Sequence, residues 1–452
     1  LSAITKIRGI QDVMQRWCEH HGLLGQMILG LLTWGRSIIW RIQAGSMSCG
    51  ELSRISSRDA MMWVTYFPYL DWELACEGIF QNTYAASLQH KFQDQGIPVI
   101  WLLLYVTIDG RSYREAVELK KSLASHGEKM FFLEEFVSFG SFLAIVWNWV
   151  CQILVSLWLN ANMSDKDLCQ GLCDVSIVPI VRQLWIKSAC GSDAIKNLVY
   201  FEAFKNIFRF SKPVSHCIYY CEMQGWEVAL NAAAREENPA LKRIAHQHSS
   251  LSVNSFPFQR SSKEMVQNGK VSDFPLPDVL ACNGHSSYRF LSEVGYPSLH
   301  LVEAVRQLHI LHLWEAKLSY ESKSDVLLVA GSIEYEETKA MLSLLASAFP
   351  VAEHFEIWLK GHPSLSIEEV LQDMGIDHRN AKYHIKAGRI EKKLCAVKVV
   401  LVPASTVAVE ALAYGCEVIV PFFSTSLSLS PLLGYEEVYH SVYKPNDLQD
   451  AM

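Results

Sequence analysis

The sequence predicts an α/β protein with two Rossmann-like domains, each built on a parallel sheet. Short apolar runs end abruptly in small or polar residues and alternate with helical patterns, which is typical of buried parallel strands that deliver loops to one edge of a sheet. One set of runs starts at Met61–Phe67, and a second set starts at Asp325–Ser332. We therefore expect a helical N-terminal segment (1–55), a first domain (56–318) with a helical insertion at about 134–210, and a second domain (319–452).

The composition excludes several classes of protein. The 452 residues suffice for two domains with separate cores, and the net charge of −7 argues against a nucleic-acid partner because such proteins carry a basic stripe. The twelve cysteines include no Cys-x2-Cys pair, so we expect no metal site and a reducing, cytoplasmic environment. The chain begins at Leu1 rather than Met, so we expect a fragment, with the second domain truncated.

Two apolar stretches are candidates for contact with a membrane. Gly22–Trp34 is followed by Arg36 and Arg41, and it fits either a membrane-surface helix or a packed accessory helix, which we favour because its polar side has few charges. Phe136–Leu159 contains no charged residue and is long enough to span a bilayer. Polar residues dilute it, so we interpret it as one or two buried or membrane-dipping helices. These stretches predict peripheral contact with a membrane.

The first domain opens with a strand-helix-strand unit. The strands Met61–Phe67 and Val99–Tyr105 enclose a helical segment, and the loop after the first strand reaches Asp71 and Glu73 at the carboxyl edge of the sheet. Open α/β sheets bind ligands at this edge. A carboxylate here suits a general base, for which Asp71 is our first candidate and Glu73 the second. The alternative is that these acids favour the first turn of the next helix through its dipole.

Two further strands of the first domain end in polar residues. Ser215–Cys221 is followed by Glu222 and Trp226, which we expect to hold a sugar through a carboxylate and a stacked ring. Leu241–His248 ends in a histidine that suits binding of an acceptor or a phosphate, or that simply satisfies a neighbouring carbonyl.

The second domain carries small and basic residues where its strands end. Gly331 and Ser332 form a turn that lets a ligand approach the backbone, and Lys360 and His362 supply positive charge and a donor. Pro363 fixes the loop of His362, while Ser405 and Thr406 open a helix whose free N–H groups favour an anion. The pattern predicts a phosphate site. It lacks the full Gly-x-Gly-x-x-Gly motif of dinucleotide oxidoreductases.

The order of these motifs resembles a known family. Strand-Lys-x-His-Pro (ending at Pro363), strand-x-x-Ser-Thr-x-x-x-Glu-Ala-x-x-x-Gly (Lys398–Gly415) and strand-Pro (Glu417–Pro421) look like the donor-nucleotide half of GT-B glycosyltransferases, which have two Rossmann-like domains facing a cleft. The His-Pro and Ser-Thr motifs are closest to bacterial sialyltransferases and Kdo transferases, which use CMP-activated sugars. In many GT-B enzymes a glutamate placed like Glu410 binds the donor ribose.

Motifs of the first domain resemble surface-carbohydrate biosynthesis proteins encoded in O-antigen clusters. They are Tyr66-Phe-Pro-Tyr-Leu-Asp71, Glu222-Met-Gln-Gly-Trp-Glu227 and Val302-Glu-Ala-Val-Arg306. The sialyltransferase motif of two acids followed by glycine is absent from the first domain, so the identity of the base and of the donor nucleotide stays open.

These resemblances imply a metal-independent glycosyltransferase without a cofactor, for which a nucleotide-sugar is the co-substrate. The acceptor is expected to be a surface polysaccharide, a lipopolysaccharide or a lipid-linked glycan at the inner face of the cell membrane. Catalysis would rest on Asp71, Glu73, Glu222 and His362, and acceptor binding on Trp226 and His248. Two alternatives remain: a nucleotide-sugar epimerase with the same fold, and a non-catalytic scaffold of a polysaccharide assembly complex.

Overall fold

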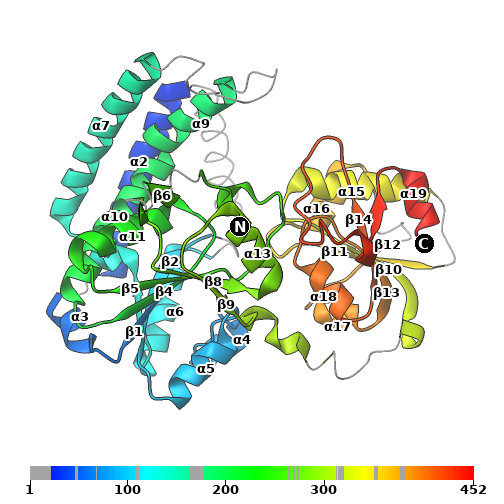
Figure 1. Cartoon of the computed structure of the whole chain (residues 1–452), viewed down its shortest axis with the longest axis horizontal. Coiled ribbons are helices and arrows are strands. Elements are labelled where there is room, and N and C mark those ends of the chain that lie inside the picture. Colours follow the sequence, from blue (N-terminus) through cyan, green and yellow to red (C-terminus); the bar gives the residue numbers. More distant parts are fainter. Residues whose placement is uncertain are drawn as a thin grey trace.

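A computed structural model gives the fold of the chain (Figure 1). It describes residues 22–45, 49–67, 69–107, 111–162, 178–261, 265–267, 270–271, 274–311, 313, 320–350, 355–376 and 383–452. Residues 1–21 of the predicted N-terminal segment lie outside the described residues.

The first domain is built on a parallel sheet of seven strands in the order β3-β2-β1-β4-β5-β8-β9. The chain runs outward from β1 to β3 and then returns to place β4 beside β1, so the strand order reverses between these two strands. The strands are β1 (Met61–Phe67), β2 (Val99–Tyr105), β3 (Lys129–Phe132), β4 (His216–Tyr220), β5 (Lys242–His246), β8 (Val279–Asn283) and β9 (Leu299–Val302). A separate antiparallel pair joins β6 (Val266–Gln267) and β7 (Lys270–Val271).

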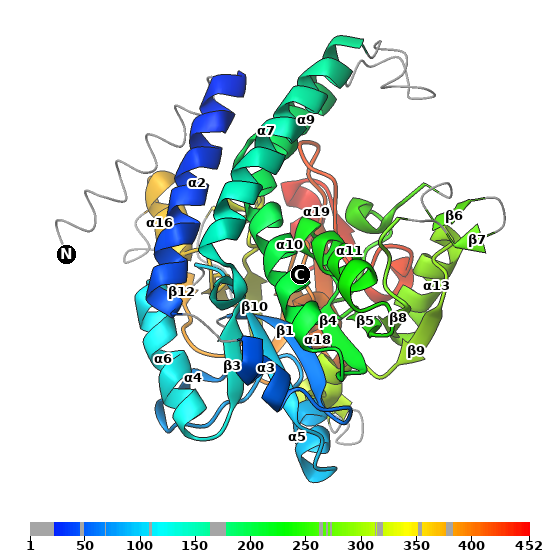
Figure 2. The same cartoon turned by 90° about the vertical axis from the view of Figure 1, so that its left-hand side faces the viewer.

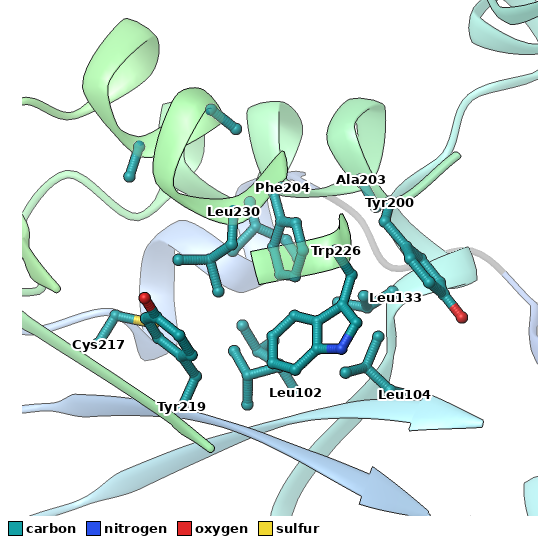
Figure 3. Packing of buried hydrophobic residues seen from close by; sticks show 14 of the residues in the cluster. Leu102, Leu104, Leu133, Tyr200, Ala203, Phe204, Cys217, Tyr219, Trp226 and Leu230 are labelled. Carbon is teal, nitrogen blue, oxygen red and sulfur yellow. The ribbon is translucent and has the colours of Figure 1, made fainter. Parts of the chain in front are cut away.

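Helices cover both faces of this sheet because its strands are apolar on both sides. Along β1, Val64 packs into the core on one face and Trp63 into the core on the other, as the alternation of a strand requires. The first core lies under α10 and α11 (Figure 3) and the second under α5 and α6. The helices and turns of this domain are α3 (Cys49–Ile55), α4 (Trp72–Cys76), α5 (Ala86–Asp94), α6 (Tyr113–Ser125), η1 (Leu133–Phe136), α11 (Gly225–Glu237), η2 (Phe256–Phe258), α13 (Gly284–Val294) and η3 (Val305–Ile310).

Additional helices stand on the first domain. They are α2 (Gly22–Ala44) at the N-terminal side, and α7 (Phe139–Asn162), α9 (Val178–Cys190) and α10 (Ser192–Phe210) between β3 and β4. The uncharged stretch from Phe136 to Leu159 therefore forms one long helix after a short turn. In two perpendicular views α2, α7 and α9 extend beyond the sheet in the same direction (Figures 1 and 2).

The second domain repeats the same topology. Its six parallel strands have the order β12-β11-β10-β13-β14-β15, with the reversal between β10 and β13. The strands are β10 (Ser324–Ala330), β11 (Glu356–Lys360), β12 (Tyr383–Ile385), β13 (Val397–Leu401), β14 (Glu417–Pro421) and β15 (His440–Val442). The helices and turns are η4 (Tyr320–Ser322), α15 (Tyr335–Ala348), α16 (Ile367–Asp373), α17 (Glu391–Leu394), α18 (Val407–Ala413), η5 (Glu436–Val438) and α19 (Pro445–Asp450).

The two domains have separate cores and meet through loops and through the helix α13. Val305 packs against the core of the first domain, whereas Ile310 and Leu313 pack with the second, so the chain crosses between domains at this point. Among the described residues, side-chain hydrogen bonds between the domains join Asp71 to Arg389, Asn254 to Ser428, and both Ser286 and Arg289 to Tyr435.

All of these contacts come from segments that follow the carboxyl ends of strands. The carboxyl edges of the two sheets therefore face one another. This confirms the predicted fold class: a GT-B-like pair of Rossmann-like domains with extra N-terminal and inserted helices.

Candidate functional site

The loop after β4 presents Glu222 where the strand order of the first sheet reverses. Its backbone is held by Glu227, whose Oε1 accepts the amide N–H groups of Glu222 (2.8 Å) and Gln224 (2.9 Å). Between them Met223 adopts a left-handed conformation with φ of 58°, which is uncommon for a residue with a side chain. Such strain persists where the surroundings over-determine the backbone, which is often at functional sites.

Two side chains lie against the Glu222 carboxylate, and a third supports one of them. Tyr66, in β1, donates its hydroxyl hydrogen to Oε2 of Glu222 (3.1 Å) and accepts the indole N–H of Trp226 (2.8 Å). His248, beyond the end of β5, places its Nε2 3.5 Å from Oε1 of Glu222. Glu222 is more accessible than His248, because its side chain is 29% exposed and that of His248 only 4%.

Aromatic rings and one cation complete the cluster. The His248 ring stacks on Tyr84 with 5.2 Å between centroids and lies 4.7 Å from the ring of Tyr220. The guanidinium of Arg306 lies 4.2 Å from the centroid of Tyr84, on the ring face. The positive charge of Arg306 therefore reaches the cluster from the segment that leads into the second domain.

Burial and charge set the protonation of the Glu222–His248 pair in opposite directions. Burial raises the pKa of Glu222, while the hydrogen bond from Tyr66 and the charge of Arg306 oppose this rise. Burial, followed by the charge of Arg306, lowers the pKa of His248 to about 3. At neutral pH His248 is uncharged, and the raised pKa of Glu222 makes its carboxylate a stronger base, which suits the removal of a proton from a substrate.

Trp226 and His248 are buried rather than open to solvent. Trp226 is 6% exposed, and its indole lies among the core side chains Leu102, Leu104 and Leu230 (Figure 3). The ring consequently offers no stacking surface for a sugar. It positions the Tyr66 hydroxyl instead, and His248 supports Glu222 in the same way.

Asp71 and Glu73, predicted as candidate bases, lie in the loop after β1. Asp71 is the N-cap of α4, and its Oδ1 accepts the amide N–H groups of Glu73 (3.0 Å) and Leu74 (3.3 Å). Its other oxygen lies 3.4 Å from Nη2 of Arg389 in the second domain. Glu73 is exposed in the first turn of the helix. Both acids thus have the structural roles that the helix dipole and capping explain.

At the facing edge of the second sheet, Lys360 ends β11 and His362 follows in the loop. The Nδ1 of His362 accepts the amide N–H of Ser364 (3.1 Å), and burial, followed by the charge of Lys360, lowers the pKa of His362. His362 is therefore neutral at pH 7, and its proton lies on Nε2, where it can be donated to an anion. The ammonium group of Lys360 bonds the carbonyl of Gly361 (3.0 Å) and is half-buried.

Gly331 and Ser332 shape this loop from the end of β10. The Gly331 amide donates to the Lys360 carbonyl (2.8 Å), and a Cβ at Gly331 would lie 3.6 Å from the amide nitrogen of His362. Ser332 is 3% exposed, and its hydroxyl accepts the amide N–H of Glu334 (3.2 Å). These two residues hold neighbouring backbone in place. Pro363 is exposed beside His362.

The loop after β13 leads into α18. The helix begins at Val407, and its N-cap Thr406 makes no side-chain capping bond, while the Ser405 hydroxyl accepts the Val407 amide N–H (3.3 Å). Glu410 is 7% exposed on the first turn. Ala408 and Ala411 of this helix are fully buried, and their small side chains let the helix pack close to the sheet.

The sequence prediction missed three residues of the first edge as site residues. Tyr66 and Arg306 lie inside the motifs on which the resemblance rests, so a signal was present. Tyr84 gave none, because it lies within the segment between β1 and β2 that was predicted to be helical, whereas in the structure it precedes α5. Within the described part of the chain, no group of three or more His, Cys, Asp or Glu side chains is placed to hold a metal ion.

The chain was compared with known proteins. No family model and no curated protein matches it. Among solved structures, UDP-GlcNAc 2-epimerase from Neisseria meningitidis bound to UDP-GlcNAc aligns at 10% identity over 87% of this chain and 90% of its own, with a TM-score of 0.45. The S. aureus MnaA–UDP complex aligns at 11% identity over 87% of each chain, with a TM-score of 0.45. A glycosyltransferase from Rickettsia africae aligns at 11% identity over 86% of each chain, with a TM-score of 0.40.

Proposed function

We propose that the protein is a glycosyltransferase that moves a sugar from a nucleotide-activated donor to a hydroxyl group of a glycan acceptor. The observation that carries the proposal is the Tyr66–Glu222–His248 cluster, which lies at the carboxyl edge of the first sheet. The loops that carry Lys360, His362 and Thr406 lie at the facing edge of the second sheet. One edge suits proton transfer and the other suits a phosphate.

On the acceptor side, Glu222 is the general base. As the acceptor oxygen forms its bond to the anomeric carbon, its proton passes to the Glu222 carboxylate, whose basicity burial increases. The Tyr66 hydroxyl and the His248 ring hold this carboxylate in one orientation. Asp71 and Glu73 then contribute to the edge through capping and the helix dipole.

On the donor side, the bond from the anomeric carbon to the phosphate oxygen breaks, and negative charge grows on the nucleotide. We assign Lys360, the Nε2–H of His362, and the hydroxyls of Ser405 and Thr406 to the stabilisation of this charge. Glu410 is assigned to the donor ribose. A CMP-sugar is the proposed donor because the Lys-x-His-Pro and Ser-Thr motifs occur in the order found in transferases that use such donors.

A nucleotide-sugar epimerase is the second candidate, and the pairing of Glu222 with His248 favours it. A carboxylate and an imidazole 3.5 Å apart are groups that epimerisation of a bound sugar would also use. An epimerase needs no acceptor and would act on a UDP-sugar alone, so the two candidates differ in the nucleotide and in the need for a second substrate.

The test is a thermal-shift screen against CMP, UDP, GDP and dTDP, run on the native protein and on His362→Ala. A nucleotide at about one hundred times its Kd adds roughly 2.7 kcal/mol to the free energy of unfolding. We expect the shift with CMP, and we expect it to disappear in His362→Ala. The His362 side chain bonds the backbone of its own loop, and it is partly exposed, so the variant should keep its fold.

His440→Ala is the matched control, because His440 is an exposed histidine on an edge strand of the same domain. It should retain the full shift. A UDP-selective shift would support the epimerase, and the absence of a shift with every nucleotide would favour the non-catalytic scaffold.

A further inference from the structure

The helices α2, α7 and α9, here called the helical projection, expose an unusual amount of apolar surface. They extend beyond the first sheet side by side (Figures 1 and 2) and carry more than half of the large apolar side chains that the described residues expose. Soluble monomers rarely expose a contiguous apolar patch of this kind unless it binds something. This surface plays no part in the site described above.

The exposed residues of α7 form a continuous stripe. They recur every three or four positions, which places them on one face of the helix, and Trp147 and Trp158 are 69% and 64% exposed. From end to end the stripe extends about 28 Å at 1.5 Å per residue. That length is close to the hydrocarbon thickness of a bilayer. Its members are Phe139, Leu143, Trp147, Val150, Leu154 and Trp158.

The helix α2 buries small residues and exposes large apolar ones, which is the reverse of the usual pattern in a soluble protein. Its buried face contains Gly30, Thr33 and Ser37, whereas Leu24 is 62% exposed and Ile42 is 63% exposed. Small residues at a helix contact with large apolar residues outside are the pattern of helices packed within lipid. Gly30 permits the closest approach, because a Cβ there would lie 2.5 Å from the Trp149 ring.

The charges of the helical projection identify the kind of surface that it meets. Its three helices contain four basic residues, Arg36, Arg41, Arg182 and Lys187, and no acidic residue, although the whole chain has a net charge of −7. Arg36 and Lys187 are exposed. Basic side chains beside an apolar face are attracted to anionic lipid headgroups.

We propose that the helical projection inserts its apolar face into a lipid bilayer that carries anionic headgroups. Both long helices are long and apolar enough to cross a membrane by length and composition, and only 28% of each apolar window is buried. A second copy of the chain is the competing occupant. A symmetric dimer through this surface would bring the same cations together without a compensating acid on these helices, which opposes that arrangement. This inference does not depend on glycosyl transfer.

The experiment is flotation of the full-length protein with vesicles of phosphatidylcholine containing phosphatidylglycerol, without any nucleotide. We expect the protein to float with these vesicles and to bind pure phosphatidylcholine more weakly. Leu143→Glu combined with Leu154→Glu should lower vesicle binding at least about tenfold, because a charge is costly in hydrocarbon. Both side chains are mostly exposed, at 73% and 61%, so the change should not disturb the core.

Leu301→Glu is the matched control, because Leu301 is also exposed (45%) but lies on β9, an edge strand of the first sheet. It should bind vesicles like the native protein. Lipids brominated in the acyl chain should quench the fluorescence of the native protein, and Trp147→Phe with Trp158→Phe should reduce this quenching.

Two results would overturn the proposal. One is a native protein that stays in the soluble fraction with anionic vesicles. The other is a dimer that the Leu143→Glu and Leu154→Glu changes dissociate, with no binding to lipid. Neither result bears on the nucleotide screen, which tests glycosyl transfer separately.

Discussion

The facing edges of the two sheets share one topology but differ in what they present. At the first edge, Tyr66, Glu222 and His248 are side chains from separate strands that contact one another, and burial changes their protonation. At the second edge, Lys360 and His362 stand at the end of one strand and in the loop that follows it, and both side chains bond neighbouring backbone.

This difference separates two tasks within one site. A network of buried side chains fixes the orientation and basicity of a carboxylate, which proton transfer requires. A loop of backbone and small residues with two basic side chains suits a large anionic group. Under the proposed function, changes at the first edge should therefore alter turnover, and changes at the second edge should alter nucleotide binding.

The largest expected effect comes from Glu222→Gln. Loss of the base should lower kcat by about 10² to 10⁴, while the thermal shift produced by the nucleotide should be unchanged. The assay is sugar transfer or hydrolysis of the donor beside the nucleotide screen. Asp71→Asn and Glu73→Gln should each retain far more activity than Glu222→Gln. If Asp71→Asn or Glu73→Gln were instead the inactive variant, Glu222 would not be the base.

A smaller effect on stability is expected from Glu227→Gln. Burial raises the pKa of Glu227 to about 8, so the folded state keeps a proton that the unfolded state loses above its ordinary pKa near 4.5. The stability of the native protein should consequently fall as pH rises from about 4.5 to about 8. The variant should show a weaker decline in Tm over this range. An unchanged slope would mean that Glu227 is ionised in the folded protein.

The smallest effect is expected from Tyr66→Phe. The hydroxyl of Tyr66 opposes the rise in the pKa of Glu222, so its removal should raise that pKa further. Activity requires the ionised base, and the acid limb of the pH profile of kcat/KM should therefore move to higher pH. The fold should survive, because only one hydroxyl is lost. If the acid limb did not move, the group that titrates there would not be Glu222.

The central strands could be predicted from the sequence, whereas the edge strands could not. β1 and β2 agree with the predicted bounds because both are almost wholly buried and therefore read as uninterrupted apolar runs. β3 and β9 were missed. Each has only four residues and lies at an edge of the first sheet, so it is too short to show a clear strand pattern.

For the candidate site, the sequence predicted which residues follow the ends of strands but not how their side chains lie. Motif order placed Glu222 and His362 at strand ends, since the carboxyl ends of parallel strands share one edge. It could not show that Trp226 would be buried, because a tryptophan can equally pack in a core or offer its ring for stacking on a sugar. Nor could it bring Arg306 to Tyr84, which are far apart in sequence and meet through the fold.

The ion pair between the two domains has a consequence for motion. It joins Asp71 to the guanidinium of Arg389, which is largely exposed, and lies apart from the bonds of Asn254, Ser286 and Arg289. Exposed ion pairs of this kind contribute less than about 1 kcal/mol. Breaking this pair would therefore cost little free energy if the domains move apart. A ligand that touches both edges would favour the arrangement in which they are close, so closure of the domains would report occupancy of the whole site.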